Sequence, residues 1–344
     1  MKVALVGCGQ MSRGWLDACA KIDDLEIVAL VDLDLAAAKR QAAAFELADV
    51  LCGTDLAAVL EATHPDIVFD VTVPAARHGV VETAIGHGCH VLTEKPMATS
   101  LADARHFIDL AAAKGRVHAV VQNRRFLAGI RRLRRFVESG AIGALTAVHC
   151  DFFIGPHFGG FREDMDHVLL LDMAIHTFDA ARYVSGAVPK AVYCHETNPK
   201  GSWYRTGAAA NAIFEMSGGV VLTYRGSWAA EGLRTSWESV WRLVGENGTL
   251  TWDGADGFAA ERPIGRTGLL SEETSIEIPP LDPGDRIGGH EGVIRDFLDA
   301  LRGGRTPECP GTDNIRSLAM VLGAIRSAET GHRVTYNDVM ELSA

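Results

Sequence analysis

The chain has 344 residues, of which 47% are hydrophobic and 22% charged, the balance of an ordinary globular protein. A chain of this length predicts two domains, because one hydrophobic core of that size usually divides. The formal net charge of −11 argues against nucleic acid as the main partner, since binding to phosphates needs clustered Lys and Arg.

Cysteine usage and hydropathy indicate a cytoplasmic protein that is not bound to a membrane. No apolar run is long enough to span a bilayer, and the first residues lead into a strand-like sequence, not an export signal. The seven cysteines are odd in number, form no CxxC motif and mostly lie in apolar runs. We therefore expect reduced, buried thiols and neither a disulfide framework nor a metal site.

The N-terminal third alternates short β-rich runs with alanine-rich segments of helical periodicity. We expect strands at 2–6, 26–32, 66–72, 90–94 and 116–122, and helices at 10–20, 35–46, 55–62, 76–87 and 100–114. Strands that are apolar on both faces and alternate with helices predict a parallel sheet covered on both sides. The predicted fold of residues 1–121 is therefore doubly wound α/β.

After about residue 120 the alternation gives way to longer strands. We expect strands at 144–153, 187–197, 208–216, 219–228, 239–246 and 248–254, with helices at 127–139, 166–184, 290–302 and 312–330. The turn sequences Ser217-Gly218-Gly219 and Glu246-Asn247-Gly248 favour antiparallel pairing. Residues 122–344 are thus predicted to form an α+β domain with a mostly antiparallel sheet.

The first strand and helix are joined by a glycine-containing turn that is typical of dinucleotide binding. Gly7 and Gly9 let the backbone approach a pyrophosphate, which the N-terminus of the next helix would hold, although Ser12 occupies the usual third glycine position. Asp32 ends the second strand, where a carboxylate accepts both ribose hydroxyls of NAD and repels the 2′-phosphate of NADP. A plain turn and a polar strand end remain the alternatives. Asp34 is better explained as the N-cap of the next helix.

The sequence Glu94-Lys95-Pro96 follows a strand at the edge of the sheet where ligands bind in open α/β folds. Proline ends the strand and holds Lys95 in a defined turn. A lysine in such a position can also be an ordinary solvated side chain.

Asp172 and His176 lie four residues apart on a predicted helix whose other residues are mostly apolar. Such a pair is either a hydrogen-bonded core feature or a site, because burying it without partners is costly. Oxidation of an alcohol by hydride transfer needs a group that accepts the hydroxyl proton. Histidine is suited to that task, and a lysine such as Lys95 can polarise the oxygen.

Arginines cluster near the start of the second domain, at Arg124, Arg125, Arg131, Arg132, Arg134 and Arg135. We interpret the last four as a solvated face or as partners in intramolecular ion pairs.

Together these motifs resemble the glucose–fructose oxidoreductase, inositol dehydrogenase and rhizopine catabolism (Gfo/Idh/MocA) family. The resemblance rests on the GCGQM turn, Val73-Pro74 with His78, Glu94-Lys95-Pro96, Asp172 with His176, and the C-terminal stretch 306–334. It covers nearly the whole chain, and the combination is specific although each piece alone is not.

The resemblance implies an N-terminal Rossmann domain and a C-terminal α+β domain whose open sheet mediates homodimers or homotetramers. The resemblance is also compatible with a C-terminal helix that packs back on the first domain. The implied catalytic residues are Lys95, which polarises the substrate oxygen, His176 as general acid/base, and Asp172, which binds substrate or tunes His176. The implied cofactor residues are Gly7, Gly9, Gln10, Met11, Asp32, Val73, Pro74, His78, Glu94, Lys95 and Gln122.

Substrate specificity is expected to come from residues outside these motifs. Candidates are Arg124, Arg125, His157, Phe158, Phe161, Arg162, Trp203, Tyr204 and Trp228, beside Lys95, Asp172 and His176. Aromatic rings stack on the apolar face of a pyranose, although each of these rings is equally well explained as core or as an oligomer contact.

The leading hypothesis is an NAD-dependent dehydrogenase that oxidises a ring hydroxyl of a sugar, glycoside or cyclitol. Two alternatives are a glycosidase that uses NAD for transient oxidation and a dinucleotide-binding regulator without catalysis. Retention of Lys95, Asp172 and His176 argues against the regulator. A metal enzyme is the weakest hypothesis, because His87 and His90 lack further ligands at suitable spacing.

Overall fold

The protein is described by a computed structural model over residues 1–265 and 268–341; residues 266–267 and 342–344 of the predicted second domain lie outside the described residues. The chain forms two compact units. Unit 1 comprises Met1–Phe126 and Arg286–Leu318, and unit 2 comprises Leu127–Asp285 and the described chain from Ala319 onward. The roles predicted for the two domains stay predictions.

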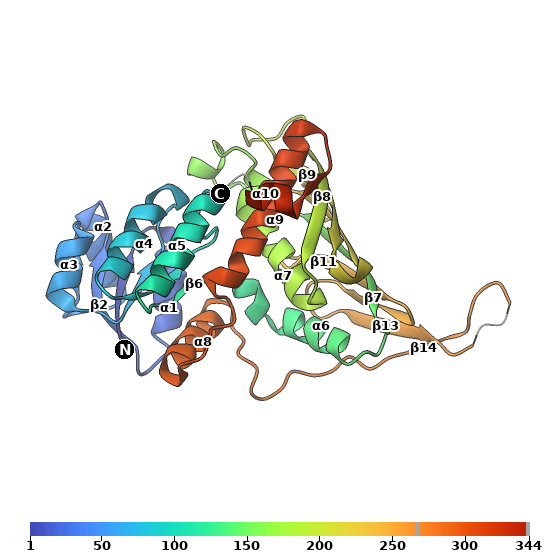
Figure 1. Ribbon diagram of the computed structural model, residues 1–344, viewed down its shortest axis with the longest axis horizontal. Helices are drawn as coiled ribbons and strands as arrows, with labels where there is room; N and C mark the ends of the chain where they lie inside the picture. The colour runs from blue at the N-terminus through green and yellow to red at the C-terminus, as the bar shows by residue number, and fades with distance from the viewer. Residues whose placement is uncertain (266–267, 342–344) are drawn as a thin grey trace. The chain divides into compact units, whose positions relative to one another are not determined.

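Unit 1 is built on a parallel sheet with the strand order β3-β2-β1-β4-β5-β6 (Figure 1). The strands are β1 (Lys2–Val6), β2 (Glu26–Val31), β3 (Leu51–Gly53), β4 (Ile67–Asp70), β5 (His90–Thr93) and β6 (His118–Val120). The helices between them are α1 (Gln10–Cys19), α2 (Leu35–Ala44), α3 (Leu56–Thr63), α4 (Arg77–Gly86) and α5 (Leu101–Ala113). This is the strand order of a Rossmann domain, which confirms the predicted fold. Among the strands of this sheet, only the short β3 was not expected.

Helices cover both faces of this sheet. On one side α3 contacts α4, and α4 contacts α5. A separate contact joins α1 to α8 (His290–Gly303). Apolar side chains of α1 and α8 form a core with those of the strands, in which Trp15 lies 4.9 Å from Phe69 between ring centroids. Trp15 is therefore held firmly by the core of unit 1.

Unit 2 contains a sheet of nine strands in the order β14-β13-β12-β11-β7-β10-β9-β8-β15. The strands are β7 (Leu145–Phe153), β8 (Pro189–Thr197), β9 (Ala209–Met216), β10 (Val221–Ser227), β11 (Val240–Gly245), β12 (Gly248–Trp252), β13 (Phe258–Pro263), β14 (Glu273–Ser275) and β15 (Val334–Thr335). The pairing is antiparallel except between β7 and β10, which confirms the predicted mostly antiparallel sheet. Strands β13 to β15 were not expected.

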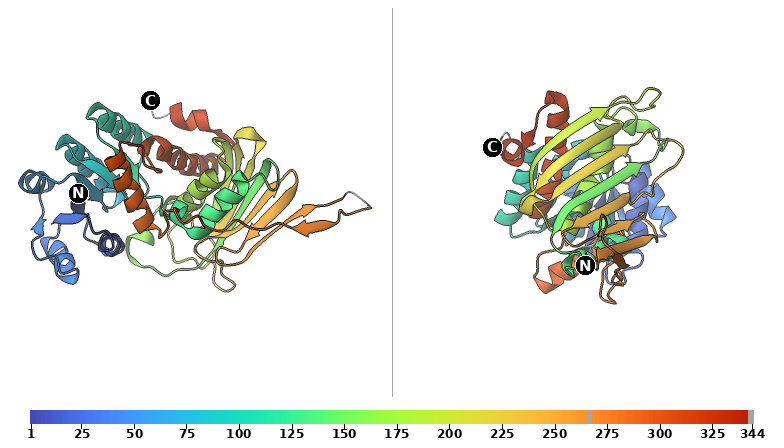
Figure 2. Two further views of the ribbon diagram at one scale, coloured as in Figure 1. Left: turned by 90° about the horizontal axis from the view of Figure 1, so that it is seen from below. Right: turned by 90° about the vertical axis from the view of Figure 1, so that its right-hand side faces the viewer.

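The helices of unit 2 lie on one side of the sheet. They include α6 (Ala128–Glu138), which contacts α7 (Ile175–Ser185), and α10 (Tyr336–Glu341), which contacts β8; the long α9 (Gly311–Thr330) precedes β15. On the strands, buried and exposed residues alternate, and Tyr193, Ile213, Val221 and Val240 point to the exposed face. The right-hand view of Figure 2 looks onto the strands of this sheet. The sheet is therefore open on one face, as predicted.

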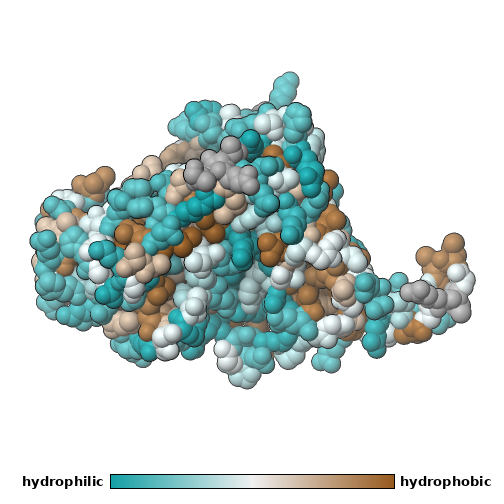
Figure 3. All heavy atoms as spheres, viewed as in Figure 1, coloured by the Kyte–Doolittle hydropathy of each residue, from teal (hydrophilic) through white to brown (hydrophobic). Residues whose placement is uncertain are grey.

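The β13–β14 hairpin exposes large apolar side chains at its end. Ile264, Leu269 and Leu270 are 61%, 99% and 82% exposed. Brown spheres gather at the end of this hairpin in Figure 3. The hairpin end thus presents more apolar surface than scattered single side chains would.

The arginines of α6 make contacts within unit 2. Arg134 is ion-paired with Glu138 at 2.6 Å, Arg135 with Asp285 at 2.7 Å, and Arg131 donates to the Tyr183 hydroxyl at 2.8 Å. These contacts confirm the interpretation of the cluster as intramolecular.

Two further expectations concern burial and membranes. The cysteines are free thiols and all but Cys52 are buried, which confirms their predicted burial. Across residues 1–265 and 268–341, none of the helices combines the length and the apolar character that crossing a lipid bilayer requires.

The turn after β1 depends on a glycine. Gly7 has φ +95°, and a Cβ at this position would lie 2.7 Å from the backbone carbonyl carbon of Val71, beyond the end of β4. Neither the dihedral angle nor the space admits another residue. By contrast, Gly9 has φ −75°, and a Cβ there would meet nothing within 4 Å.

Gly7→Ala is therefore expected to lower the free energy of unfolding by about 1–3 kcal/mol from backbone strain alone. Gly9→Ala, the matched control, should leave stability nearly unchanged. Chemical denaturation of both variants measures the difference, and equal stabilities would contradict the steric argument.

Candidate active site

The N-terminus of α1 is open to a ligand. Its N-cap, Gly9, offers no side chain, so no side-chain cap competes with an anion for the N–H groups of the first turn. Ser12 is fully buried, and its hydroxyl donates to the Gly9 carbonyl at 2.6 Å. The serine in place of the third glycine is thus satisfied within the turn and leaves the helix end unobstructed.

Asp32 directly follows β2 and lies against the same turn. Its Oδ2 accepts from the Cys8 N–H at 2.7 Å and its Oδ1 from the Asp34 N–H at 2.9 Å. Each oxygen keeps a lone pair with which it can accept from a ribose hydroxyl. Asp34 accepts from the Ala36 N–H, which confirms its prediction as the N-cap of α2. Burial, with the nearby Asp32 charge, raises the pKa of the Cys8 thiol to about 12, so this cysteine is no nucleophile at neutral pH.

Other predicted cofactor residues lie near the carboxyl end of the parallel sheet. Met11 and Val73 are exposed, and Pro74 opens the 3₁₀ turn Pro74–Ala76 after β4. Gln122 is fully buried, and its side-chain amide has no hydrogen-bond partner among the described residues. A glycine cradle, an uncapped helix end, a carboxylate and an unsatisfied amide together fit a dinucleotide.

A buried ion pair organises the same edge of the sheet. Arg77 Nε lies 3.0 Å from Asp70 Oδ2, and both side chains are at most 1% exposed. Asp70 also accepts from the hydroxyls of Thr72, at 2.5 Å, and Thr93, at 2.7 Å. Arg77 in turn donates to the carbonyls of Thr72 and Pro96. The pair therefore links the ends of β4 and β5 to the turn that carries Lys95.

Glu94 is held by side chains from α1 and α8. Its Oε1 accepts from Trp15 Nε1 at 2.8 Å and lies 3.2 Å from His290 Nε2, while its Oε2 accepts from the Lys95 N–H at 3.0 Å. Burial alone would raise the pKa of Glu94, but the hydrogen bond and charge of His290, with Lys95 and Trp15, hold it below its ordinary value. These contacts favour a positioning role for Glu94, through the backbone of Lys95.

Lys95 itself is half-buried and precedes Pro96 in a cis peptide bond. The turn beyond β5 is thus fixed by Pro96, by the Arg77 contact to its carbonyl and by Glu94. Lys95 belongs to unit 1, whereas Asp172 and His176 belong to unit 2. That the three act together stays a prediction.

The helix that carries Asp172 and His176 is not a regular α-helix. Residues Leu169–Ala174 form a π-helix, and α7 begins at Ile175. The expected α-helix over 166–184 is therefore corrected at its N-terminal end. Such π segments are frequent at functional sites, because they widen the helix and change the direction of its side chains. Asp172 and His176 are half-buried among residues that are almost all buried, so they share the accessible face.

Asp172 has a strong partner on the loop before the helix. Arg162, in the 3₁₀ turn Gly160–Arg162, donates from Nε to Asp172 Oδ2 at 2.6 Å. The guanidinium carbon of Arg162 also lies 5.0 Å from the Phe158 ring centroid and 4.8 Å from that of Phe161. Phe158 and Phe161 are 48% and 55% exposed, so a charged group and two accessible aromatic rings stand together beside Asp172.

The other predicted aromatic residues are engaged in packing. Tyr204 and Trp228 are buried and stacked, and the Tyr204 hydroxyl donates to the Pro156 carbonyl at 2.7 Å. Trp203 Nε1 donates to the same carbonyl at 2.9 Å, and the His157 ring stacks on Trp203. Of this set, His157 and Trp203 keep accessible surface.

The two arginines after β6 differ in their environment. Arg125 is buried and ion-paired with Asp313 at 2.7 Å, and it also donates to the Glu308 carbonyl at 3.1 Å. These contacts favour a structural role for Arg125, which links the segment after β6 to Glu308 and Asp313, over a role in substrate binding. Burial lowers the pKa of Arg124 to about 10, so it remains charged at neutral pH.

The sequence did not identify four residues of unit 1 that support the site, Asp70, Arg77, Trp15 and His290. It also did not identify a hydrogen-bonded pair in unit 2. In that pair His167 Nδ1 lies 2.5 Å from Glu196 Oε2, and the hydrogen bond raises the pKa of His167. Only the apolar setting of Asp70 at the end of a buried strand signals a partner in the sequence. The other contacts join segments far apart in the chain.

Replacing Arg77 by methionine is expected to lower the free energy of unfolding by about 3–5 kcal/mol, because the Asp70 charge stays buried without its partner. The control is Arg40→Met, which breaks an exposed pair with Asp34 and should cost less than about 1 kcal/mol. Urea unfolding followed by circular dichroism compares the two. Similar losses for both variants would contradict the role assigned to the buried pair.

Comparison with known proteins agrees with this geometry. Residues 1–122 match the model described as an oxidoreductase family with an NAD-binding Rossmann fold, and residues 130–251 match the GFO/IDH/MocA C-terminal domain. The chain is 28% identical to D-apiose dehydrogenase of Paraburkholderia graminis, over 97% of this chain and 89% of that protein. It is 25% identical to 1,5-anhydro-D-fructose reductase of Ensifer adhaerens, over 95% and 96%.

A solved structure has the same fold. The oxidoreductase from Agrobacterium radiobacter in complex with NAD+, L-tartaric acid and magnesium superposes with a TM-score of 0.85 at 23% identity, over 98% of both chains. With both domain models matched in order, the chain belongs to the Gfo/Idh/MocA family and is an oxidoreductase with an NAD-binding Rossmann domain.

Proposed function

We propose that this enzyme is an NAD-dependent dehydrogenase that oxidises a ring hydroxyl of a sugar, glycoside or cyclitol. The observation that carries the proposal is the accessible Asp172–His176 pair on an otherwise buried helix that begins with a π turn. A catalytic acid/base needs this combination of access to substrate and rigid support. The names of the relatives, which include an apiose dehydrogenase and an anhydrofructose reductase, support a carbohydrate substrate.

In the proposed mechanism His176 accepts the proton of the substrate hydroxyl during oxidation and returns it during reduction. The Lys95 ammonium donates a hydrogen bond to the same oxygen and stabilises the charge that develops on it. NAD, held by the turn after β1 and by Asp32, would supply the hydride acceptor for the carbinol carbon. Asp70, Arg77, Pro96 and Glu94 keep the backbone of Lys95 in place, so that little reorganisation is needed in the transition state.

Recognition of the sugar is assigned to the group formed by Phe158, Phe161 and Arg162. A pyranose or cyclitol has an apolar face that stacks on an aromatic ring and hydroxyls that bond to a guanidinium or carboxylate. Arg162 and Asp172 supply these polar groups beside the two exposed rings. Tyr204 and Trp228 support the platform from the interior.

The variants Lys95→Ala and His176→Ala are each expected to lower kcat for the best substrate by about 10²–10⁴-fold, because each removes a group that acts on the reacting oxygen. For His176→Ala, the affinity for NAD should fall by a much smaller factor than kcat does. Steady-state NADH production over a panel of sugars and cyclitols measures the effect, with the exposed Lys190→Ala as control.

Unchanged turnover in both variants would contradict the assigned roles. Release of a sugar from a glycoside without net NADH would instead favour the transient-oxidation glycosidase.

The preference for NAD is assigned to Asp32. Asp32→Ala is expected to weaken NAD binding by about 10–100-fold, through loss of charged hydrogen bonds to the ribose, and to narrow the preference over NADP. Asp34→Ala is the matched control, because it removes the helix cap of α2 and an exposed ion pair with Arg40 but leaves the carboxylate of Asp32 in place. Fluorescence titration with both cofactors measures the change, and tighter binding of NADP than NAD by the unaltered enzyme would contradict the assignment.

We also propose that the open face of the unit 2 sheet joins two or more copies of the chain. It exposes Ile213 and Tyr193 by 51% and 47%. Ile213→Asp should shift the enzyme toward the monomer, because a charge would be buried at the interface. Sedimentation velocity measures this shift, and a monomeric unaltered enzyme would contradict the proposal.

A further inference from the structure

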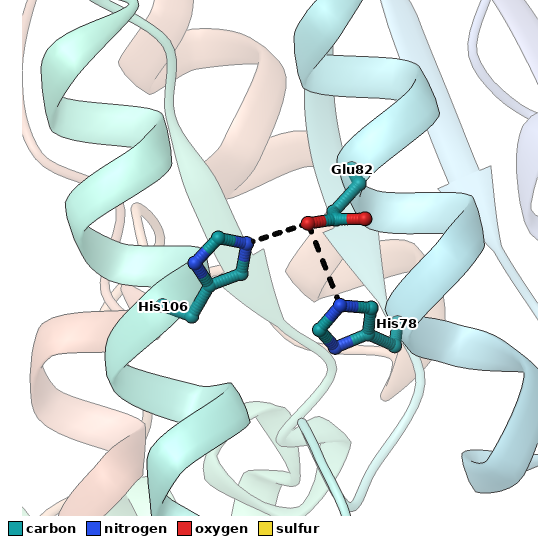
Figure 4. Close-up of side chains that lie close together, drawn as sticks. All are labelled: His78, Glu82 and His106. Atoms are coloured by element: carbon teal, nitrogen blue, oxygen red, sulfur yellow. Dashed lines mark hydrogen bonds and ion pairs between the residues drawn. The ribbon is translucent and has the colours of Figure 1, made fainter.

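Two histidines from different helices of unit 1 face one carboxylate at the surface. His78 and Glu82 lie one turn apart on α4, and His106 lies on α5 (Figure 4). Glu82 Oε1 is 2.8 Å from His106 Nε2 and 3.4 Å from His78 Nε2. The two imidazole rings are stacked, with centroids 5.4 Å apart and planes inclined by 8°.

A fourth side chain determines which nitrogen of His78 faces Glu82. His78 Nδ1 lies 2.9 Å from Asp103 Oδ1, and Asp103 Oδ2 accepts from the Ser100 hydroxyl at 2.8 Å. Because a carboxylate only accepts, the contact with Asp103 requires the proton of His78 on Nδ1.

The neutral form of His78 then directs the lone pair of Nε2 toward Glu82 Oε1, which also carries only lone pairs. Two acceptors 3.4 Å apart repel each other unless a hydrogen-bond donor or a cation lies between or beside them. A proton on Nε2 or a bridging water relieves this repulsion, and so does a metal ion. Histidine ligands whose second nitrogen is held by a carboxylate are the usual arrangement at metal centres.

We propose that His78 Nε2, His106 Nε2 and Glu82 Oε1 bind a divalent transition metal ion of the Zn²⁺ class. Two imidazoles and one carboxylate suit such ions, whereas Mg²⁺ and Ca²⁺ prefer all-oxygen ligands. The ligand atoms lie within 4.8 Å of one another. Ligands of a tetrahedral Zn²⁺, each at about 2.0–2.1 Å, lie about 3.3 Å apart, so small rotations of exposed side chains complete the site.

The fourth position is left for water, and the ion links α4 to α5. Glu82 and Asp103 supply the two negative charges that balance it. The site is built within unit 1, and none of its three ligands belongs to the residues assigned to catalysis, Lys95, Asp172 and His176. The sequence suggested only a cofactor role for His78, because His106 lies on another helix and completes no recognisable ligand motif.

The test uses the full-length protein after treatment with a chelator. Isothermal titration with Zn²⁺ alone should show one saturable site, which His106→Gln and His78→Gln each weaken by at least about tenfold; Asp103→Asn should weaken it by about 10–100-fold. His332→Ala, which removes an exposed histidine after α9, is the matched control and should bind as the unaltered protein does. Zn²⁺ should raise the melting temperature of the unaltered protein but not of His106→Gln, since an ion bound only to the folded state stabilises it.

X-ray absorption of the loaded protein should show nitrogen and oxygen ligands with imidazole scattering. Absence of saturable binding would overturn the proposal, as would equal affinity in His106→Gln. Zn–S distances near about 2.3 Å would do so too, because they would assign the ion to a cysteine such as the partly exposed Cys52. The melting temperature without metal shows that each variant is folded before its affinity is compared.

Discussion

The buried ion pair between Asp70 and Arg77 is the interaction on which the cofactor half of this enzyme depends. A carboxylate at the end of a central strand is costly to bury, and it is stable here because Arg77 and the hydroxyls of Thr72 and Thr93 satisfy it. Through the Pro96 carbonyl, the same guanidinium reaches the turn after β5. The ends of β4 and β5 and the turn that carries Lys95 are therefore linked by one electrostatic arrangement.

Glu94 extends this arrangement into the core. It joins the backbone of Lys95 to Trp15 on α1 and His290 on α8. Since α1 also begins at the glycine turn after β1, that turn and the turn that carries Lys95 share a common support.

Unit 2 relies on a different arrangement. The π turn at Leu169–Ala174 and the Arg162–Asp172 pair set apart a small polar face on a helix that is otherwise embedded in apolar contacts. The exposed Phe158 and Phe161 lie on the loop before this helix. The exposed aromatic rings and the polar face of the helix therefore lie on separate segments of unit 2.

The amino-acid sequence determined the elements whose signals are local. Apolar strands alternating with helices specified the doubly wound sheet, and hairpin turns specified the antiparallel one; Gly7, Asp32, Lys95, Asp172 and His176 stood out because their motifs occupy consecutive or helically spaced positions. The tertiary structure alone decided the long-range partners: Asp70 with Arg77 across a turn, Glu94 with His290, Arg125 with Asp313, and His78 with His106. It also decided the π turn, the short edge strands and the engagement of Tyr204 and Trp228 in packing. Such features depend on which side chains come into contact in the folded chain, and the order of residues along the sequence does not specify these contacts.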